Sequence, residues 1–240
     1  MKTKILLTLL LVLSFLVTEA QDADEIISNY FENTGGLDAW KELKSMKIKA
    51  TFDQGGMQLN AVIYRKQPDL SRTEIVVQGK TIVQAYDGET GWMINPMMGS
   101  EDPQKMPAEM EEAMKDEKFE SELIDYQEKG NTVELEGTEE VEGTETYKVK
   151  LTKKNGDVEY YFFDTEYFVP IMERRAIKVG PMKGQESETY ISDYQEVNGL
   201  MVPYYIEVKA NGQSMQKLTI QEYALNENLA DSLFKYPGEE

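Results

Sequence analysis

The sequence predicts a mainly β fold with a few helices (α+β), dominated by a strongly curved antiparallel sheet of about ten or eleven strands. Apolar and polar residues alternate with a period of two over many short runs, as in strands with one buried face. Two-residue turn signals separate these runs, at positions 55–56, 79–80, 87–88, 155–156, 198–199 and 211–212. Turns this short join antiparallel strands, and a sheet of so many strands has to curl or close.

Helical spacing marks the segment before the first strand. Apolar residues recur at intervals of three and four from Ile26 to Phe31, and Gly35-Gly36 ends this pattern. A second short helical piece, LDAWKELKSM, follows from Leu37. The period then changes to two between Met46 and Phe52, where we expect the first strand. At the other end of the chain, ENLADSLF predicts a last short helix.

One interval, residues 102–126, interrupts the series of strands. Met106, Met110 and Met114 recur there at every fourth position, which predicts an amphipathic helix of about three turns beginning near Pro107. Methionine is over-used where a surface adapts to varied apolar ligands, so this helix could line a pocket for acyl chains. Ordinary core packing and soft-metal ligation by thioether sulfur are the alternative interpretations.

Residues 1–20 have the features of a secretory signal peptide. Lys2 and Lys4 form a short basic region, and a mostly apolar run of 13 residues follows, from Ile5 to Val17. Small residues at the −3 and −1 positions predict cleavage after Ala20. The apolar run is shorter than the roughly 20 residues that a membrane-spanning helix needs.

We therefore expect residues 21–240 to form a single soluble domain in the periplasm, without a membrane span. The whole chain carries a formal charge of −19, and removal of the signal segment makes the remainder more negative still. Such a surface repels nucleic acid, so we expect no nucleic-acid partner. Its simplest use is solubility.

The chain contains no histidine and no cysteine. These absences exclude Ser-His-Asp and Cys-His nucleophiles, His/Cys zinc sites and disulfides. Carboxylates are abundant, but their spacing does not single out a pair suited to glycoside hydrolysis, and EDP, EMEE and EGTEEVEGTE are interpreted as solvated faces and turns. DGETG lacks the twelve-residue calcium-loop pattern. We expect no enzymatic activity, no metal and no cofactor.

The stretch from Tyr64 to Pro96 resembles the LolA-like family of periplasmic outer-membrane lipoprotein-sorting and carrier proteins. The shared frame is a strand that ends in basic residues and proline, a second strand, then Asp-Gly-x-Thr-x-Trp and Asn-Pro. The matching residues here are Pro68, Asp87, Gly88, Thr90, Trp92, Asn95 and Pro96. The C-terminal FKYPGE is similar to the family's Phe-x-x-Pro ending, and GGLDAWKELKSMKIKATF looks like the opening of many exported Bacteroidetes proteins of this kind.

The resemblance implies an unclosed β-barrel whose concave apolar face receives acyl chains beneath helices that act as a lid. In the family, an arginine immediately before the proline holds this lid; here that position is Gln67, and Arg65 stands two residues earlier. We therefore assign the lid contacts to Arg65 and Gln67. The ligand-binding residues expected on this view are Ile63, Ile75, Val77, Trp92, Ile94, Met106, Met110 and Met114.

The leading hypothesis from the sequence is a non-enzymatic periplasmic carrier of lipid or lipoprotein acyl chains. We expect a monomer whose partners are these acyl chains and the donor and acceptor proteins of the cell envelope. One alternative is a structural or interaction module of the envelope, whose sheet interior is filled by its own side chains. Another is a histidine-free glycan hydrolase, which would need two carboxylates across a polar cleft.

Overall fold

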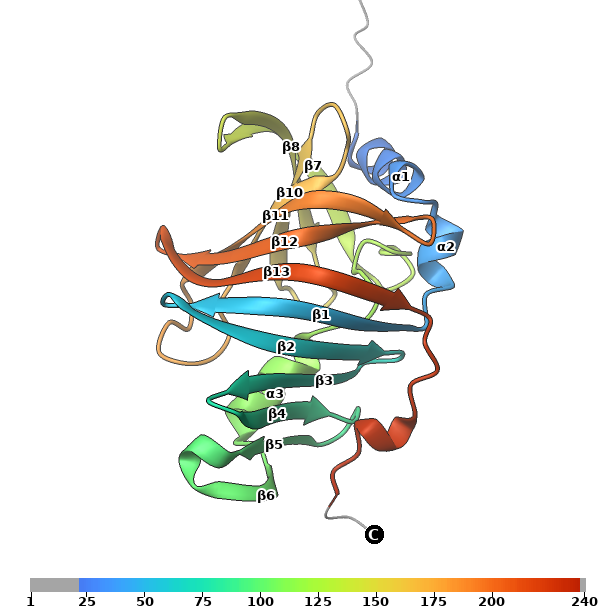
Figure 1. The fold of residues 1–240 in the computed structure, drawn as a ribbon. Coiled ribbons are helices and arrows are strands. Elements are labelled where there is room, and N and C mark those ends of the chain that lie inside the picture. The colour runs from blue at the N-terminus through green and yellow to red at the C-terminus, as the bar shows by residue number, and fades with distance from the viewer. Residues whose placement is uncertain (1–21, 238–240) are drawn as a thin grey trace, which may run out of the picture.

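The structure, a computed structural model, describes residues 22–237, so the predicted signal segment and its cleavage site lie outside the described residues. Thirteen strands form a single sheet in the order β6-β5-β4-β3-β2-β1-β13-β12-β11-β10-β9-β8-β7 (Figure 1). The strands are β1 (Ser45–Gln54), β2 (Met57–Lys66), β3 (Leu70–Val77), β4 (Lys80–Tyr86), β5 (Gly91–Asn95), β6 (Ser100–Lys105), β7 (Thr132–Val141), β8 (Thr144–Thr152), β9 (Val158–Asp164), β10 (Pro170–Ala176), β11 (Glu186–Val197), β12 (Leu200–Ala210) and β13 (Gln213–Leu225). The helical elements are α1 (Ala23–Asn33), α2 (Leu37–Lys41), η1 (Pro96–Met98), α3 (Ala108–Asp116) and η2 (Asp231–Leu233).

The predicted fold class is confirmed, with thirteen strands in place of ten or eleven. β6 and the second half of β7 do not follow the apolar alternation on which the prediction rests. β6, SEDPQK, is mostly exposed and contains Pro103, which an edge strand tolerates because its outer N–H groups need no partner. β7 at the other edge is rich in glutamate, and it contains part of the stretch interpreted as solvated turns.

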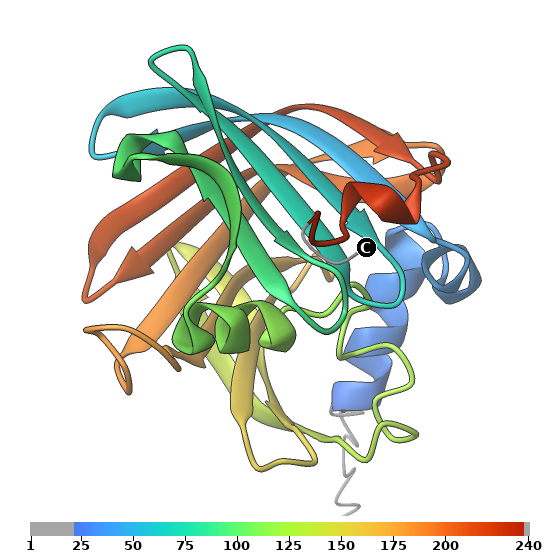
Figure 2. The same ribbon diagram turned by 90° about the horizontal axis from the view of Figure 1, so that it is seen from below.

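The sheet consists of two meanders, β1–β6 and β7–β13, which join where β1 pairs with β13. Neighbouring strands within each meander pair antiparallel. β6 and β7 are the two edges of the sheet, so the sheet curves without closing (Figure 2). α3 and the following residues 117–131 connect these edges across the concave side, where α1 also lies.

α1 covers the concave face of β8 and β9. Its apolar side, which includes Ile26 and Phe31, packs against Val149, Leu151 and Phe163, all of them buried. The helical period in the sequence therefore identifies the buried side of α1 correctly. Burial of this apolar area, at about 25 cal/mol per Å², stabilises one end of the curved sheet.

Gly35 allows the chain after α1 to lie against the turn between β11 and β12. Its φ is +113°, and a Cβ atom at this position would lie 2.2 Å from the carbonyl oxygen of Gly199. Thr34 completes the contact, because its carbonyl accepts a hydrogen bond from the Met201 amide at 3.1 Å. The Thr34 hydroxyl accepts a second bond from the Trp40 indole N–H at 3.0 Å.

The C-terminal segment lies on the convex face of the sheet, over β3 to β5. The Trp92 indole N–H donates to the carbonyl of Phe234 at 2.6 Å, and the Phe234 side chain is fully buried. Arg72 donates to the carbonyl of Leu233 at 3.0 Å. The predicted last helix is reduced to the single turn η2 within this segment.

Candidate binding site on the concave face

α3 lies across the open side of the curved sheet and is attached on both sides. The Gly91 amide at the start of β5 donates to Glu111 at 3.1 Å. On the opposite side, the Gly180 amide in the β10–β11 connection donates to Glu109 at 2.7 Å, and Asp116 forms an ion pair with Lys178 at 2.7 Å. The predicted mid-chain helix is thus present, begins directly after Pro107 and bridges the two halves of the sheet.

The three methionines of the mid-chain stripe lie in different environments. Met106 is buried and packs against Gly91. A Cβ atom built on Gly91 would lie 3.3 Å from the Met106 sulfur. Met110 is 37% exposed, and Met114 is half-buried. At 100° per residue, Met110 and Met114 share the side of α3 opposite the exposed Glu112, between its two attached edges. They are therefore not ordinary core residues.

The predicted sheet residues Ile63, Ile75 and Val77 lie on the concave face and are half-buried. The register β2–β3–β4–β5 pairs Arg65 with Ser71, Ser71 with Tyr86, and Tyr86 with Gly91, which touches α3. Side chains at alternate positions share a face, so these three apolar residues face the same side as Gly91. Ile63 packs against a buried cluster formed by Ala50, Leu218 and Ile220.

The prediction that Trp92 and Ile94 belong to the concave face is wrong. Both alternate with Gly91 and therefore point to the convex face, where they cluster with Val83 and Ala85 beneath the C-terminal segment. Alternation in the sequence correctly puts them on one face. It cannot tell which face, because this part of the sheet is covered on both sides. The concave position in β5 belongs to Met93, which is half-buried.

The two predicted lid contacts, Arg65 and Gln67, have different partners. Arg65 donates to the carboxylate of Glu117 at 3.0 Å and to the carbonyl of Lys118 at 2.9 Å. It therefore holds the start of residues 117–131. Gln67 instead donates to the carbonyl of Leu43 at 2.9 Å. The start of the segment after α3 is thus held by Arg65 and by Asp69, which accepts a hydrogen bond from the Phe119 amide at 3.0 Å.

Replacing Arg65 with alanine is expected to loosen residues 117–120. Hydrogen bonds to charged groups contribute roughly 1.5–3 kcal/mol each, so amide exchange at Phe119 should become about tenfold faster or more. Hydrogen–deuterium exchange with mass spectrometry measures this rate. Lys49→Ala, which removes an exposed ion pair with Glu222, is the matched control and should leave the segment unchanged. Unchanged exchange in the Arg65 variant would contradict the assigned role.

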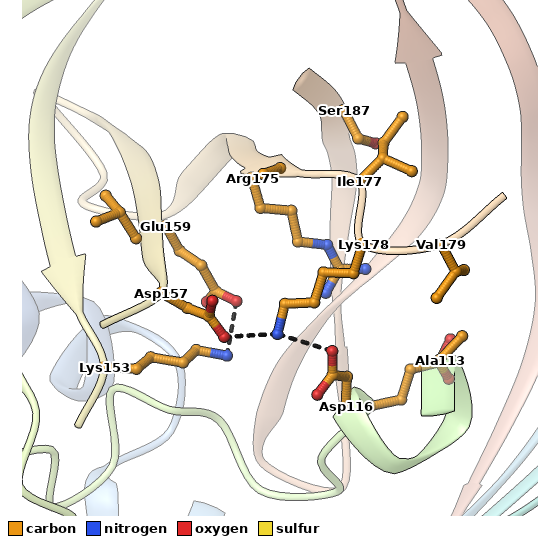
Figure 3. A pocket seen from close by; sticks show the side chains of 13 residues that line it. Ala113, Asp116, Lys153, Asp157, Glu159, Arg175, Ile177, Lys178, Val179 and Ser187 are labelled. Carbon is orange, nitrogen blue, oxygen red and sulfur yellow. Dashed lines mark hydrogen bonds and ion pairs between the residues drawn. The ribbon is translucent and has the colours of Figure 1, made fainter. Parts of the chain in front are cut away.

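Two adjoining cavities lie beneath α3 and residues 117–131. We call them the inner cavity, of about 280 Å³, and the outer cavity, of about 240 Å³. Five aromatic side chains contribute to the wall of the inner cavity: Tyr30, Phe31, Trp40, Phe119 and Tyr161. Glu159 and Arg175 line both cavities. Figure 3 shows Arg175 and Lys178 pointing into the outer cavity from its sheet side.

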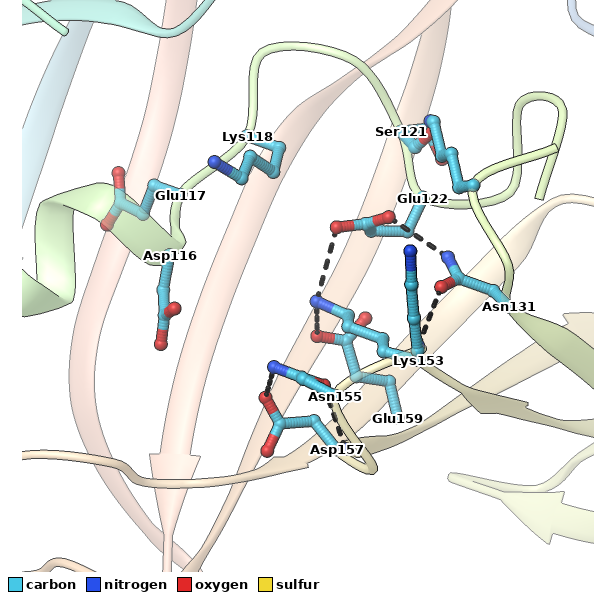
Figure 4. A network of polar contacts seen from close by, with 12 residues as sticks. Asp116, Glu117, Lys118, Ser121, Glu122, Asn131, Lys153, Asn155, Asp157 and Glu159 are labelled. Carbon is cyan, nitrogen blue, oxygen red and sulfur yellow. Dashed lines mark hydrogen bonds and ion pairs between the residues drawn. The ribbon is translucent and has the colours of Figure 1, made fainter.

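A network of ion pairs and hydrogen bonds includes residues that line both cavities (Figure 4). The Lys153 Nζ atom lies 2.7 Å from a carboxylate oxygen of Glu159 in β9 and 3.6 Å from one of Glu122. Lys153 therefore links β9 to residues 117–131. Lys178 in turn bridges Asp116 of α3 and Asp157, at 2.7 and 2.6 Å. The hydrogen bond from Lys178 lowers the pKa of Asp157, although burial opposes this shift.

Glu173 of β10 is half-buried in the wall of the inner cavity. Burial raises the pKa of this carboxyl group from 4.5 to about 7; Arg175 opposes the shift and Glu159 adds to it. Burial also raises the pKa of the Tyr30 and Tyr161 hydroxyls, and the charge of Glu173 adds to both shifts. The inner cavity therefore combines aromatic walls with an acid that titrates near neutral pH.

Sequence patterns do not single out these polar cavity residues. Arg174-Arg175 reads as one surface basic pair, yet the two side chains point to opposite faces of β10, and only Arg175 lines the cavities. Arg174 lies over the Phe162 ring and pairs with Glu188 at 3.1 Å. The available signal was the two-residue period of a strand, which puts Glu173 and Arg175 of PIMERRA on one face.

Within residues 22–237, no group of three or more acidic side chains is arranged to hold a metal ion. Over the same residues, every helix is too short or too polar to cross a lipid bilayer. The concave side has half-buried apolar side chains on one part and paired charges on another.

No family model matches the sequence, and no curated protein matches it either. Similar folds are found among crystal structures. A DUF1329 family protein from Desulfovibrio piger has a TM-score of 0.59 at 14% identity, over 91% of this chain and 99% of that chain. A LolA superfamily protein from Nitrosomonas europaea has a TM-score of 0.57 at 12% identity, over 90% and 98%.

A third structure, a putative outer membrane lipoprotein-sorting protein domain from Vibrio parahaemolyticus, has a TM-score of 0.53 at 10% identity, over 88% of this chain and 94% of that chain. At such identities the likeness is one of fold. It extends over nearly the whole length of each structure and agrees with the motifs between Tyr64 and Pro96. The protein therefore has the LolA-like fold that its sequence resembles.

Proposed function

We propose that the protein is an exported, periplasmic carrier that binds the acyl chains of lipids or lipoproteins. The binding surface is the concave face of β2 and β3, covered by α3 and residues 117–131. The observation that carries the proposal is a set of apolar side chains that are not fully buried, on the concave face of β2 and β3 and on one side of α3: Ile63, Ile75, Val77, Met110 and Met114. Apolar residues gathered on one concave surface are typical of ligand-binding grooves, whereas scattered ones are common on any protein surface.

The energetics of acyl-chain binding suit this surface. Each methylene group transferred from water to an apolar site contributes about 0.8 kcal/mol, so affinity does not require a dedicated polar group. Methionine adapts its shape to chains of different length and branching. The similar structures support the proposal, because one is a LolA superfamily protein and another a putative outer membrane lipoprotein-sorting domain. The signal peptide predicted over residues 1–20 supports export.

Converting Met110 to aspartate is expected to weaken binding of a fluorescent fatty acid at least tenfold. The new carboxylate would lie against the acyl chain, and burial of an unpaired charge in apolar surroundings is unfavourable. Fluorescence titration of the purified protein measures the dissociation constant. The circular dichroism spectrum should not change, because the wild-type side chain is 37% exposed.

Met98→Asp is the matched control, since Met98 is 79% exposed in the β5–β6 connection and should not affect binding. Native mass spectrometry of protein purified from its own periplasm adds an independent measurement. Absence of both a co-purifying lipid and fatty-acid binding would favour the structural module, in which the protein's own side chains fill the concave face.

A further inference from the structure

Two opposite charges in the cavities have no direct partner. Eleven charged residues line the inner and outer cavities among residues 22–237, and nine of them form ion pairs: Asp116, Glu117, Lys118, Glu120, Glu122, Lys153, Asp157, Glu159 and Lys178. The other two, Glu173 and Arg175, form no hydrogen bond and no ion pair within this part of the chain. Glu173 is half-buried and Arg175 is exposed to solvent, so it is the carboxylate of Glu173 that lacks a counter-ion in a partly buried position.

The strand geometry explains why these two side chains do not pair with their neighbours. They stand two positions apart on the concave face of β10, so their Cα atoms are roughly 6.6 Å apart along the strand. Glu173 is in register with Tyr161 and Thr189, which carry no opposite charge. Arg175 is in register with Glu159, but the carboxylate of Glu159 is already bound to Lys153 at 2.7 Å.

Each unpaired group has a natural complement. A guanidinium group offers a planar fork of donors that fits phosphate oxygens. A carboxylate facing aromatic rings favours an ammonium group, which also interacts with the faces of those rings. Either cavity is smaller than the roughly 300–1,000 Å³ of a pocket for a whole drug-sized ligand, so each suits one polar group rather than an entire lipid.

We propose that these cavities bind a zwitterionic head group, with its ammonium group beside Glu173 in the inner cavity and its phosphate group at Arg175. Such a head group is neutral overall, so the acidic protein does not repel it. The acyl chains of the same ligand would extend over the apolar concave face. The placement of the acyl chains rests on the proposed carrier function. The head-group site does not, because it depends only on Glu173 and Arg175.

Isothermal titration calorimetry of the exported chain at pH 8 tests the proposal with tail-free probes. Glycerophosphoethanolamine carries both groups, glycerol 3-phosphate lacks the ammonium group, and ethanolamine lacks the phosphate. We expect Glu173→Gln and Arg175→Gln each to weaken glycerophosphoethanolamine binding at least tenfold. Glu173→Gln should weaken ethanolamine binding but not glycerol 3-phosphate binding, and Arg175→Gln should show the reverse. Arg174→Gln, on the opposite face of the same strand, is the matched control.

Two results would overturn the proposal: no binding of glycerophosphoethanolamine at millimolar concentration, or equal weakening by Arg174→Gln and Arg175→Gln. A parallel titration with dihexanoyl phosphatidylethanolamine identifies the source of the head group. Much tighter binding of this short-chain lipid indicates a lipid ligand, and equal binding indicates a free zwitterion. Failure of the carrier function shows separately, as loss of fatty-acid binding while glycerophosphoethanolamine still binds.

Discussion

Replacement of Trp92 with alanine is expected to lower the free energy of unfolding by about 3–5 kcal/mol, as in other truncations of large buried aromatic side chains. The indole is 1% exposed, and its N–H holds the carbonyl of Phe234 at 2.6 Å. Its removal leaves a cavity beneath the C-terminal segment and a carbonyl oxygen without its partner. Urea denaturation followed by circular dichroism measures the change.

Trp92→Phe keeps one aromatic ring but loses the N–H donor and part of the buried ring volume, so it should cost less than the alanine variant. We expect it to cost about 1–3 kcal/mol. Both variants should bind the fluorescent fatty acid as the wild type does at a temperature where they are folded, since Trp92 lies on the convex face. If a Trp92 variant loses fatty-acid binding with little loss of stability, the assignment to the convex face is contradicted and Trp92 contacts the ligand.

Replacement of Glu173 with glutamine is expected to stabilise the protein at pH 8. The pKa of this carboxyl group is 4.5 in the unfolded chain and about 7 in the folded protein. The folded state therefore binds more protons between these values, and wild-type stability falls as the pH rises from 4.5 to about 7. The full shift corresponds to about 3.4 kcal/mol; because the carboxylate keeps some access to the cavity, we expect about 1–3 kcal/mol.

Glutamine has no charge to bury, so the variant should lose this part of the pH dependence. Urea denaturation at pH 4.5, 6 and 8 compares the two proteins, which should differ most at pH 8. Glu196→Gln, at an exposed position of β11, is the control and should leave the difference between pH values intact. Equal stability of the wild type and the Glu173 variant at pH 8 would contradict the prediction. Greater stability together with weaker head-group binding is the behaviour expected of a functional residue.

Local patterns in the sequence predict most of the fold. The apolar period of α1, the turn signals and the alternation from Met46 to Phe52 depend on neighbours within a few residues. They therefore identify helices, strands and antiparallel pairing. The edge strands β6 and β7 are harder to detect because each has only one neighbour and keeps many side chains in water.

The candidate site is less predictable because it depends on which face of the sheet is concave. Ile75 and Trp92 both belong to alternating runs, but only the register and the path of the C-terminal segment put them on opposite faces. Arg65 contacts residues 117–118, and no local rule indicates that partner. Likewise, Glu173 and Arg175 read as surface charges in the sequence, and only the fold puts both on the wall of the cavities, with Glu173 half-buried and Arg175 still exposed.

The pairing of β1 with β13 also determines when this protein can finish folding. Met46 is opposite Leu225, so the seam between the two meanders joins the beginning of the domain to its end. All other strand pairs are between neighbours in the sequence and can form early and locally. Contacts between distant residues form slowly because a long loop must first be ordered. A chain that folds as it is extended from its N-terminus would therefore hold two separate half-sheets, and the proposed ligand surface would be complete only after the last strand had paired.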